Sequence, residues 1–438
     1  MTLKLNETHD PQAKSWLKSA NLEGAPFPIQ NLPFGVYRPA EGPAAGDRIG
    51  VAIGDSVFDL QAAAKLLDPV SSEIHSACRS PLLNDLMSLA PEPLSQLRRS
   101  LFRLLHESAP PAWQREAQAL LAPQSAVTMK LPCRIGDYTD FYAGIHHAQN
   151  VGRLFRPQNP LLPNYKWIPI AYHGRSSSIV ISGTPIPRLS GQIKSEDSAA
   201  PVFAPTRRLD YELELGFFVG RGNAMGEPIP LDHAEEHIFG VGLLNDWSAR
   251  DIQAWEYQPL GPFLAKNFAT TISPWIVTME ALTPFRCRAF SRFEGDPEPL
   301  PYLRSVADSE EGGFDISLEI TLSTEQMRMA GTEPVMVCAT SSRNLYWTAA
   351  QCIAHHASSG CNLRPGDLLG SGTISGENGG ELGSLLELTQ QGKAPVDMPN
   401  GQQRIFLERG DEVTMRGWCR SKGYKPIGLG ECRGRITG

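Results

Sequence analysis

The pattern of apolar and polar positions predicts a compact β unit followed by helices in the first part of the chain. Residues 34–37, 48–55 and 57–60 are short apolar runs separated by turn residues, which is typical of antiparallel strands. Helical periodicity follows over residues 94–105 and 112–121, with Pro110 and Pro111 between the two segments. Residues 122–125 are typical of a linker. We therefore predict a first domain over residues 1–125 and a second over 126–438.

Strand patterns dominate the second part of the chain. Short β-rich runs bounded by Gly, Pro or Asn predict strands at residues 165–171, 178–182, 210–219, 314–322 and 412–417. Helices are expected only near Asp232, where one begins, and over residues 348–358. A chain of 438 residues is too long for one ordinary core, which agrees with two domains. The pattern as a whole predicts a β-rich α+β fold.

Composition and charge argue against several classes of protein. The net charge is −7 and the chain has no long basic run, which argues against nucleic acid as a partner. Its eight cysteines are scattered without a Cys-x-x-Cys pair, unlike a disulfide framework or a structural zinc site. The first residues lack the apolar stretch of a signal peptide, and no apolar run is long enough to span a bilayer. We expect a cytoplasmic protein without a membrane partner.

The segment 135–142 concentrates chemically active side chains. It contains two aspartates and two tyrosines, and His147 follows closely. Gly136 and the Asp/Thr cluster predict a turn-rich loop, and polar loops of this kind are often functional. Asp140 is suited to bind a divalent cation, and His147 is a candidate general base near neutral pH. The alternative is a surface loop whose aspartates cap neighbouring backbone.

Three further carboxylates extend this picture. Glu212 and Glu214 are two residues apart in a predicted strand, so they share a face, and the apolar run that follows indicates burial. Two buried like charges repel unless a cation or a shared proton lies between them. Asp246 follows the apolar run 241–244, although Asn245 or Asp246 could instead be a helix N-cap. With Asp140, these residues form an all-oxygen set suited to Mg²⁺ or Ca²⁺ rather than zinc.

Other positions have two interpretations each. Lys266 is a surface lysine or, if it faces the acids, an electrophilic stabiliser. The glycine-rich segment 370–376 permits close ligand approach or is a tight connector. Glu387, within the apolar run 385–388, is half-exposed or is buried with a partner such as a histidine.

Two familiar motifs are rejected. His233 and His237 match the H-x-x-E-H pattern of zinc peptidases, but a helix only begins there, so surface residues on a first turn fit better. Residues 220–226 resemble a dinucleotide-binding loop, but the glycine spacing is off by one. The prolines that follow also prevent the helix whose N-terminus would bind phosphate.

Taken in order, the motifs resemble the fumarylacetoacetate hydrolase family. The resemblance rests on residues 135–142 with 147–152, 172–180, 212–214, 245–257, 261–275 and 362–387. It implies a small SH3-like barrel at the N-terminus and a C-terminal mixed β-sandwich roll that carries the site and pairs into a homodimer. It also implies hydrolysis of the carbon–carbon bond of 4-fumarylacetoacetate, a diketo acid, to fumarate and acetoacetate, with Mg²⁺ and/or Ca²⁺ as cofactor. This reaction is the last step of tyrosine and phenylalanine degradation.

The same resemblance implies a role for each site residue. Metal ligands would be Asp140, Glu212, Glu214 and Asp246. His147 would be the water-activating base and Glu387 the carboxylate that orients it. Groups that stabilise the departing carbanion would be Arg250, Gln253 and Lys266. Substrate contacts would be Tyr142, Arg156, Tyr172, Tyr257 and Thr373. Lys266 and Thr270 also match a second, structural Mg²⁺ site.

Small departures and competing functions remain. Ala265, Asn267 and Ala269 stand where animal members more often carry Gly, Ser and Gly, so fine substrate preference could differ. The alternatives are a hydratase or decarboxylase acting on a related oxo acid, a non-catalytic metal-binding scaffold, and a metallopeptidase. Relatives of the first kind generally lack the N-terminal domain and the His–Glu arrangement.

Overall fold

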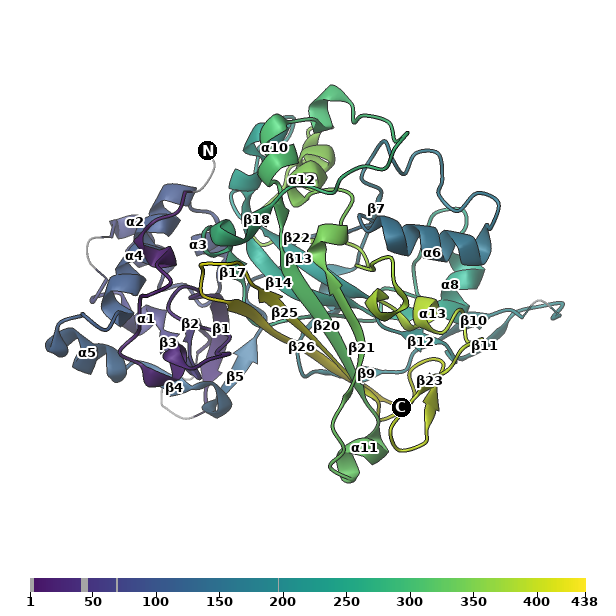
Figure 1. The fold of residues 1–438 in the computed structure, drawn as a ribbon, viewed down its shortest axis with the longest axis horizontal. Helices are drawn as coiled ribbons and strands as arrows, with labels where there is room; N and C mark the ends of the chain where they lie inside the picture. The colour runs from purple at the N-terminus through teal and green to yellow at the C-terminus, as the bar shows by residue number, and fades with distance from the viewer. Residues whose placement is uncertain (1–3, 41–45, 68–69, 196) are drawn as a thin grey trace.

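A computed structural model describes residues 4–40, 46–67, 70–195 and 197–438, and these form two packed domains (Figure 1). The smaller, N-terminal domain contains a five-stranded antiparallel sheet in the order β4-β3-β2-β1-β5, covered by short helices. This sheet is consistent with the predicted small barrel. Its strands are β1 (Phe34–Pro39), β2 (Arg48–Ile53), β3 (Ser56–Asp59), β4 (Leu121–Pro123) and β5 (Val127–Lys130). Its helices are α1 (Leu60–Ala63), α2 (Ser72–Ala77), α3 (Asn84–Met87), α4 (Pro91–Leu105) and α5 (Pro111–Gln118).

The local sequence explains these elements. Helix α4 begins at Pro91, where a missing N–H costs nothing, and its buried face includes Leu97, Leu101 and Leu104 at helical spacing. Residues 122–125, predicted as a linker, instead complete β4 and a short 3₁₀ turn, because β4 pairs with β3. The next strand, β5, pairs with β1. The domain boundary stays a prediction, and this pairing favours a position after Lys130.

The larger domain is a sandwich of two sheets. One has the order β7-β6-β22-β13-β14-β16-β8 with β17 beside β14, and the other has the order β21-β20-β25-β26-β9. Leu215 and Leu243 from the first sheet share a core with Leu318 and Met415 from the second. The predicted β-rich α+β sandwich is confirmed. The strands of the first sheet are β6 (Tyr138–Phe141), β7 (Ala171–His173), β8 (Ile179–Ile181), β13 (Leu213–Val219), β14 (Ile238–Asp246), β16 (Thr270–Ile272), β17 (Val277–Thr278) and β22 (Leu368–Gly370). Those of the second are β9 (Pro185–Pro187), β20 (Ile316–Ser323), β21 (Val335–Ser341), β25 (Glu412–Cys419) and β26 (Ile427–Thr437).

The central strands β13 and β14 are buried on both faces. Leu215 and Leu243 face the core of the sandwich, while Phe218 and Leu244 belong to the core shared with the N-terminal domain. Alternate residues of a strand share a face, so Glu214 lies on the face of Phe218, and Asp246 on that of Leu244. The two acids are therefore placed inside the protein by the same sheet that joins the domains.

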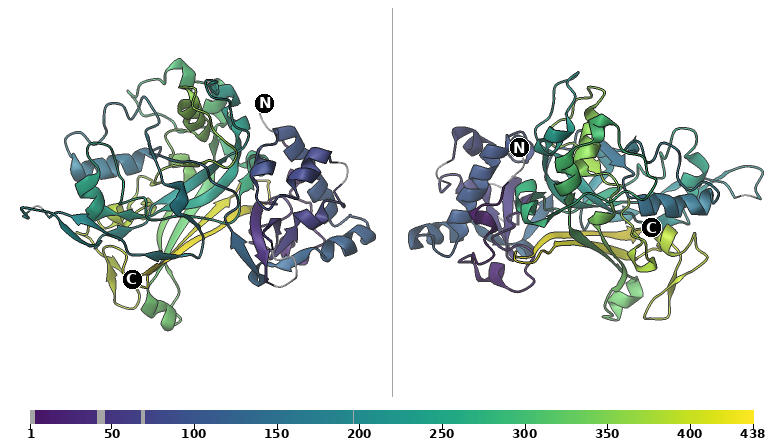
Figure 2. Two further views of the ribbon diagram at one scale, coloured as in Figure 1. Left: turned by 180° about the vertical axis from the view of Figure 1, so that it is seen from behind. Right: turned by 45° about the horizontal axis from the view of Figure 1, so that its top comes forward.

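The remaining elements surround these sheets (Figure 2). The hairpin of β10 and β11 projects from the body of the protein (Figure 1). The other helices are α6 (Ile145–Phe155), α7 (Leu231–Ala234), α8 (Arg250–Glu256), α9 (Met279–Leu282), α10 (Val306–Glu311), α11 (Glu325–Met329), α12 (Ala349–Ala357) and α13 (Leu385–Leu388). The small strands are β10 (Ser190–Ile193), β11 (Val202–Pro205), β12 (Leu209–Asp210), β15 (Ser248–Ala249), β18 (Arg286–Cys287), β19 (Gly313–Phe314), β23 (Val396–Asp397) and β24 (Gln403–Arg404).

Several predicted elements need correction. Residues 165–170 form turns and irregular backbone and not a strand, and β7 begins only at Ala171. Pro169 interrupts this stretch, and Tyr165 is buried against the ring of Tyr142. The segment 135–142 is not a loop throughout, because β6 occupies Tyr138–Phe141. The predicted strand 210–219 is broken between β12 and β13. The helices expected near Asp232 and over 348–358 are confirmed as α7 and α12, the latter with a Thr348 capping box.

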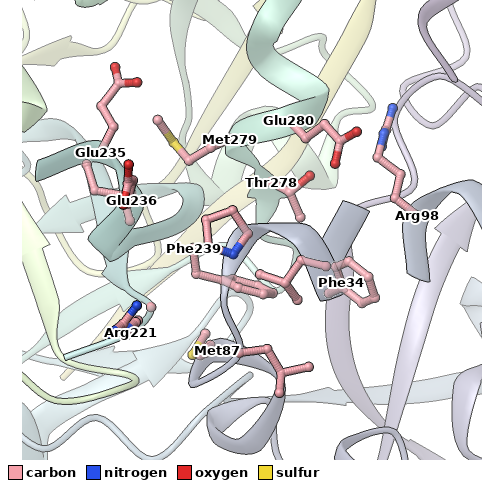
Figure 3. Close-up of a pocket in the computed structure, with 15 residues that line it drawn as sticks. Phe34, Met87, Arg98, Arg221, Glu235, Glu236, Phe239, Thr278, Met279 and Glu280 are labelled. Carbon is pink, nitrogen blue, oxygen red and sulfur yellow. The ribbon is translucent and has the colours of Figure 1, made fainter. Parts of the chain in front are cut away.

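A pocket lies where the two domains meet (Figure 3). Arg98 in its wall is buried and donates hydrogen bonds to Thr8 and to the backbone oxygens of Gln30 and Asn31. Glu280 on the opposite domain accepts from Asn6 and Ser95. Arg98 is thus bonded within its own domain, and Glu280 is bonded across the domain contact, which indicates a structural junction.

Two global findings bear on the sequence predictions. All eight cysteines are free thiols. Within the described residues, no helix combines the length and the apolar character needed to cross a membrane.

Candidate active site

Four carboxylates from separate elements converge in the larger domain. Asp140 lies on β6, Glu212 immediately before β13, Glu214 on β13, and Asp246 at the end of β14. One oxygen from each lies within 4.8 Å of the others. All four residues are buried, each at most 5% exposed. The structure therefore brings together the four acids that the sequence singles out. Asp246 ends a strand, so it is not a helix N-cap.

A glycine makes room for this cluster. Strand β22 lies between β6 and β13, and Gly370 pairs with Asp140 on one side and with Gly216 on the other. A Cβ atom on Gly370 would lie 2.5 Å from Asp140 Oδ1 and 2.9 Å from Glu214 Oε2. Only glycine lets the carboxylates approach so closely to the backbone.

Gly370→Ala is expected to weaken divalent-metal binding by at least about tenfold, because the new methyl group displaces two carboxylates from one site. Isothermal titration with Mg²⁺ or Ca²⁺ measures the effect. Gly379→Ala is the control, since a Cβ there meets nothing within 4 Å. Equal affinities for the two variants would contradict the role of Gly370.

Two basic groups neutralise one side of the cluster. Lys266 Nζ lies 2.8 Å from Asp246 Oδ2 and also contacts Glu212, and Arg250 Nη1 lies 2.7 Å from Glu212 Oε1. Burial raises the pKa of Glu212, but Lys266 and Arg250 outweigh burial and hold that pKa below its usual value. Burial opposes the charge on Lys266 too, yet Asp246 and Glu212 raise its pKa. Lys266 thus faces the acids as a cation.

The other side of the cluster is left uncompensated. Burial, and then the charge of Asp246, raises the pKa of Asp140 well above its usual value; burial and the charge of Asp140 do the same for Glu214. Asp140 Oδ1 and Glu214 Oε1 are buried and have no hydrogen-bond partner among the described residues. Buried oxygens without partners, in an all-carboxylate set, are the environment that a hard divalent cation satisfies. The donor set fits Mg²⁺ or Ca²⁺.

These raised pKa values predict how pH changes the stability of metal-free protein. A raised folded-state pKa stabilises the fold below the unfolded pKa, near 4, and this contribution is lost as pH rises through the folded value. With chelator present, the melting temperature of wild type should therefore fall relative to Glu214→Gln between about pH 5 and 8. The lowered pKa of Glu212 acts only below this window.

The comparison with Glu214→Gln is needed because buried histidines act in the opposite sense. Burial lowers the pKa values of His9 and His356, so their contribution to stability grows as pH rises. Both proteins carry these histidines, and the difference between their melting temperatures isolates the carboxylate. A difference that is constant over this pH range would contradict the raised pKa of Glu214. Saturating Mg²⁺ should reduce the pH dependence.

A histidine–glutamate pair lies beside the cluster. His147 is on α6, and its Nδ1 lies 2.7 Å from Oε2 of Glu387 on α13. Glu387 also accepts hydrogen bonds from Asn150, Ser375 and Ser384 at 2.8–2.9 Å. Burial raises the pKa of Glu387, but His147 and these donors lower it overall. The carboxylate is therefore held as an anion against the imidazole, as predicted for a buried Glu387.

Arg250 contacts Glu212 of the acidic cluster. It begins α8, and its Nη1 also donates to Gln253 Oε1 at 3.1 Å. Its Nη2 is buried and has no partner in the part of the chain that the structure describes. A buried guanidinium N–H without a partner is available to an oxygen of a bound ligand.

Of the five residues expected to contact substrate, two touch the acidic cluster or His147 directly. Tyr172 donates to Asp246 Oδ2 at 2.7 Å, and the ring of Tyr142 packs edge-on against His147 with 5.4 Å between centroids. Arg156 directly follows α6, and its buried Nε has no partner among the described residues. Tyr257 follows α8 and is 37% exposed, and Thr373 is buried in the loop after β22.

The predicted second ion site is also near the cluster. Thr270 donates to Asp246 Oδ1 at 2.9 Å. A protonated ammonium group has no lone pair, so Lys266 could ligate an ion only through its backbone carbonyl.

Some residues at the site have no sequence prediction. Asn150 lies three positions after His147 and therefore on the same helical face, a spacing that could have identified it. Ser384 is the N-cap of α13 and lies three positions before Glu387, a Ser-x-x-Glu spacing that could also have identified it. Ser375 reaches Glu387 only through the fold, and the backbone N–H of Gly372 donates to Glu214 Oε2 at 3.1 Å. Such contacts leave no pattern in the sequence.

Comparisons with known proteins agree with the geometry. Residues 30–132 match the family description "Fumarylacetoacetase N-terminal", and residues 137–437 match "Fumarylacetoacetate (FAA) hydrolase C-terminal". The chain is 49% identical over 420 residues to a Homo sapiens protein named fumarylacetoacetase, covering 94% of this chain and 97% of that one. It is 48% identical over 417 residues to the Arabidopsis thaliana protein of the same name, with 94% and 96% covered.

A solved structure shows the fold alone. It is a fumarylacetoacetate hydrolase from the psychrophilic Exiguobacterium antarcticum, with a TM-score of 0.50 and 15% identity, covering 93% of this chain and 99% of that chain. The two family descriptions together span most of the sequence, and the relatives match it nearly from end to end. This chain belongs to the fumarylacetoacetate hydrolase family.

Proposed function

We propose that this enzyme hydrolyses the carbon–carbon bond of 4-fumarylacetoacetate to fumarate and acetoacetate, the last step of tyrosine and phenylalanine degradation. The observation that carries the proposal is the pairing of His147 with Glu387 beside a buried four-carboxylate cluster. The names of relatives that are 48–49% identical over 94% of the chain support the same substrate.

His147 would act as the base that activates water. Its Nδ1 is engaged by Glu387, so Nε2 is left to accept a proton from a water molecule. Glu387 keeps the imidazole in this orientation and stabilises the imidazolium that forms. The activated water attacks the carbonyl carbon beside the fumaryl group.

Cleavage requires the acetoacetate carbon to leave as a stabilised enolate, because carbon is otherwise a poor leaving group. Arg250, Lys266 and Gln253 would donate hydrogen bonds or positive charge where this negative charge develops. When bound by Asp140, Glu212, Glu214 and Asp246, Mg²⁺ or Ca²⁺ supplies Lewis acidity to the diketone oxygens. Substrate carboxylates and oxygens would be held by Tyr142, Arg156, Tyr172, Tyr257 and Thr373. The backbone of Lys266, with Thr270, would serve a structural Mg²⁺.

An ultraviolet assay for loss of fumarylacetoacetate, with and without chelator, tests this function. Turnover should be fast with Mg²⁺ or Ca²⁺, lost with chelator and restored when the ion is returned. Absence of turnover by folded, metal-loaded protein would favour a hydratase, a decarboxylase or a non-catalytic scaffold. The bonded His147–Glu387 pair favours hydrolysis over these alternatives.

We further propose a cytoplasmic homodimer. Eight free thiols agree with a reducing compartment. Exposed apolar side chains gather on the β10–β11 hairpin and after α8, among them Phe203 at 76% and Phe263 at 67%. A second copy of the chain is the occupant we propose for this surface. Light scattering should give twice the chain mass, and Phe203→Asp should give a monomer; a monomeric wild type would contradict the dimer.

A further inference from the structure

A buried aspartate outside the proposed catalytic set connects the two halves of the site. Asp210 ends β12 and is 0% exposed. Its Oδ2 accepts from Arg250 Nε at 2.8 Å and from the backbone N–H of Leu386 at 3.0 Å. Its Oδ1 accepts from the backbone N–H groups of Leu385 and Tyr211, both at 2.8 Å. Four donors from three segments thus converge on one carboxylate.

Three of these donors belong to two parts of the site, the start of α13 and the Arg250 guanidinium. Leu385 and Leu386 open α13, and helix-opening N–H groups have no partner within their own helix. Asp210 supplies that partner and so fixes the turn that carries Glu387. Through Arg250 Nε it also fixes the guanidinium, whose Nη1 reaches Glu212 and whose Nη2 remains available.

We propose that Asp210 is a positioning residue for the reaction, which holds the Arg250 guanidinium and the Glu387–His147 pair in one relative arrangement. This role rests on the proposed function, because Arg250 and His147 act on opposite sides of the bond that breaks. Asp210 itself touches neither substrate nor the metal in this role. It acts on the rate by keeping the base and the charge-stabilising group in register, where a displacement of about 1 Å lowers the rate on the order of 10²-fold.

Asp210→Asn is the direct test. The amide keeps the size of the side chain but replaces an acceptor with an N–H₂ group that faces other donors. We expect kcat for fumarylacetoacetate to fall roughly 10²-fold, with a smaller change in KM and with unchanged Mg²⁺ content.

Asp411→Asn is a matched control for the loss of a buried charge. Asp411 is also 0% exposed and pairs with a buried arginine, since Arg404 Nε and Nη2 lie 2.7 and 3.0 Å from its oxygens. It accepts a backbone N–H as well, from Glu408 at 2.8 Å. If Asp210 were only structural, both variants would lose stability and keep the same kcat per folded molecule.

A double-mutant cycle identifies the route of the effect. Asp210→Asn should lower kcat much less in an Arg250→Gln or Glu387→Gln background than in wild type, because the positioned group is already gone. If Asp210→Asn lowered kcat by the same factor in both backgrounds as in wild type, the positioning role would be overturned. A kcat of Asp210→Asn equal to that of Asp411→Asn would overturn it as well.

Two further outcomes are distinguishable. A wild-type enzyme that does not hydrolyse fumarylacetoacetate contradicts the proposed function, whereas an active wild type with a fully active Asp210→Asn contradicts only the role of Asp210. If Asp210→Asn does not fold, Asp210→Glu keeps the charge and shifts the carboxylate by one methylene. A reduced kcat at normal metal content then supports the role, and wild-type kcat overturns it.

Discussion

His147→Asn is expected to lower kcat for fumarylacetoacetate hydrolysis by about 10²- to 10⁴-fold, the usual contribution of a general base. Asparagine can still donate a hydrogen bond to Glu387, but it cannot accept a proton from water near neutral pH. Bound Mg²⁺ or Ca²⁺ should remain at the wild-type level, because His147 is not one of the four clustered carboxylates. Steady-state kinetics and elemental analysis of the same preparation measure both quantities.

The adjacent histidine provides the control. His146 is buried like His147, but its ring packs against Phe290 and Phe293. His146→Asn should keep its kcat after correction for folded fraction. Wild-type turnover by His147→Asn, or an equal loss in both variants, would remove the base assignment.

Asp246→Ala and Asp140→Ala should each abolish detectable hydrolysis and weaken metal binding by more than about 100-fold. This loss is larger than that expected for a residue that only hydrogen-bonds to a metal ligand. Asp246 has the larger expected effect on its neighbours, because it accepts from Tyr172 and Thr270 and lies 2.8 Å from Lys266. Its removal leaves Glu212 as the ion-pair partner of Lys266 among the described residues. Asp140 instead has an oxygen without a partner among the described residues, so its removal affects mainly the ion.

Metal content by mass spectrometry and activity are measured together, with circular dichroism to confirm folding. Asp411→Ala serves as the control for deleting a buried aspartate away from the cluster. Unchanged metal content in both Asp140→Ala and Asp246→Ala would contradict the four-carboxylate site.

The candidate site was predictable to the extent that its chemistry is local in sequence. Glu212 and Glu214 lie within or beside an apolar run, and a buried pair of acids needs compensation wherever the chain places it. Asp246 likewise follows a run that became a fully buried strand. His147 is a candidate base from its residue type and place in the sequence, and the resemblance to a family adds Glu387 as the carboxylate that orients it. The structure brings the two within 2.7 Å.

Contacts between segments that are distant in the sequence could not be predicted from it. Residues 138–141 look like a polar loop because their polarity serves the site, yet they form a buried strand beside β22. Residues 122–125 have a linker's composition, but β4 and β5 close the N-terminal sheet. Asp210 lies in an ordinary strand pattern. Its role becomes visible only in the structure, where it accepts hydrogen bonds from the start of α13 and from Arg250.

Hydrolysis of fumarylacetoacetate in ¹⁸O-labelled water, followed by mass spectrometry of the products, tests the central claim most directly. If His147 activates water against the fumaryl carbonyl, fumarate should gain a heavy oxygen in its new carboxylate. An equal amount of acetoacetate should form, and chelator should stop both. Failure of the metal-loaded wild type to release fumarate, or release of carbon dioxide or a hydrated substrate instead, would contradict carbon–carbon bond hydrolysis.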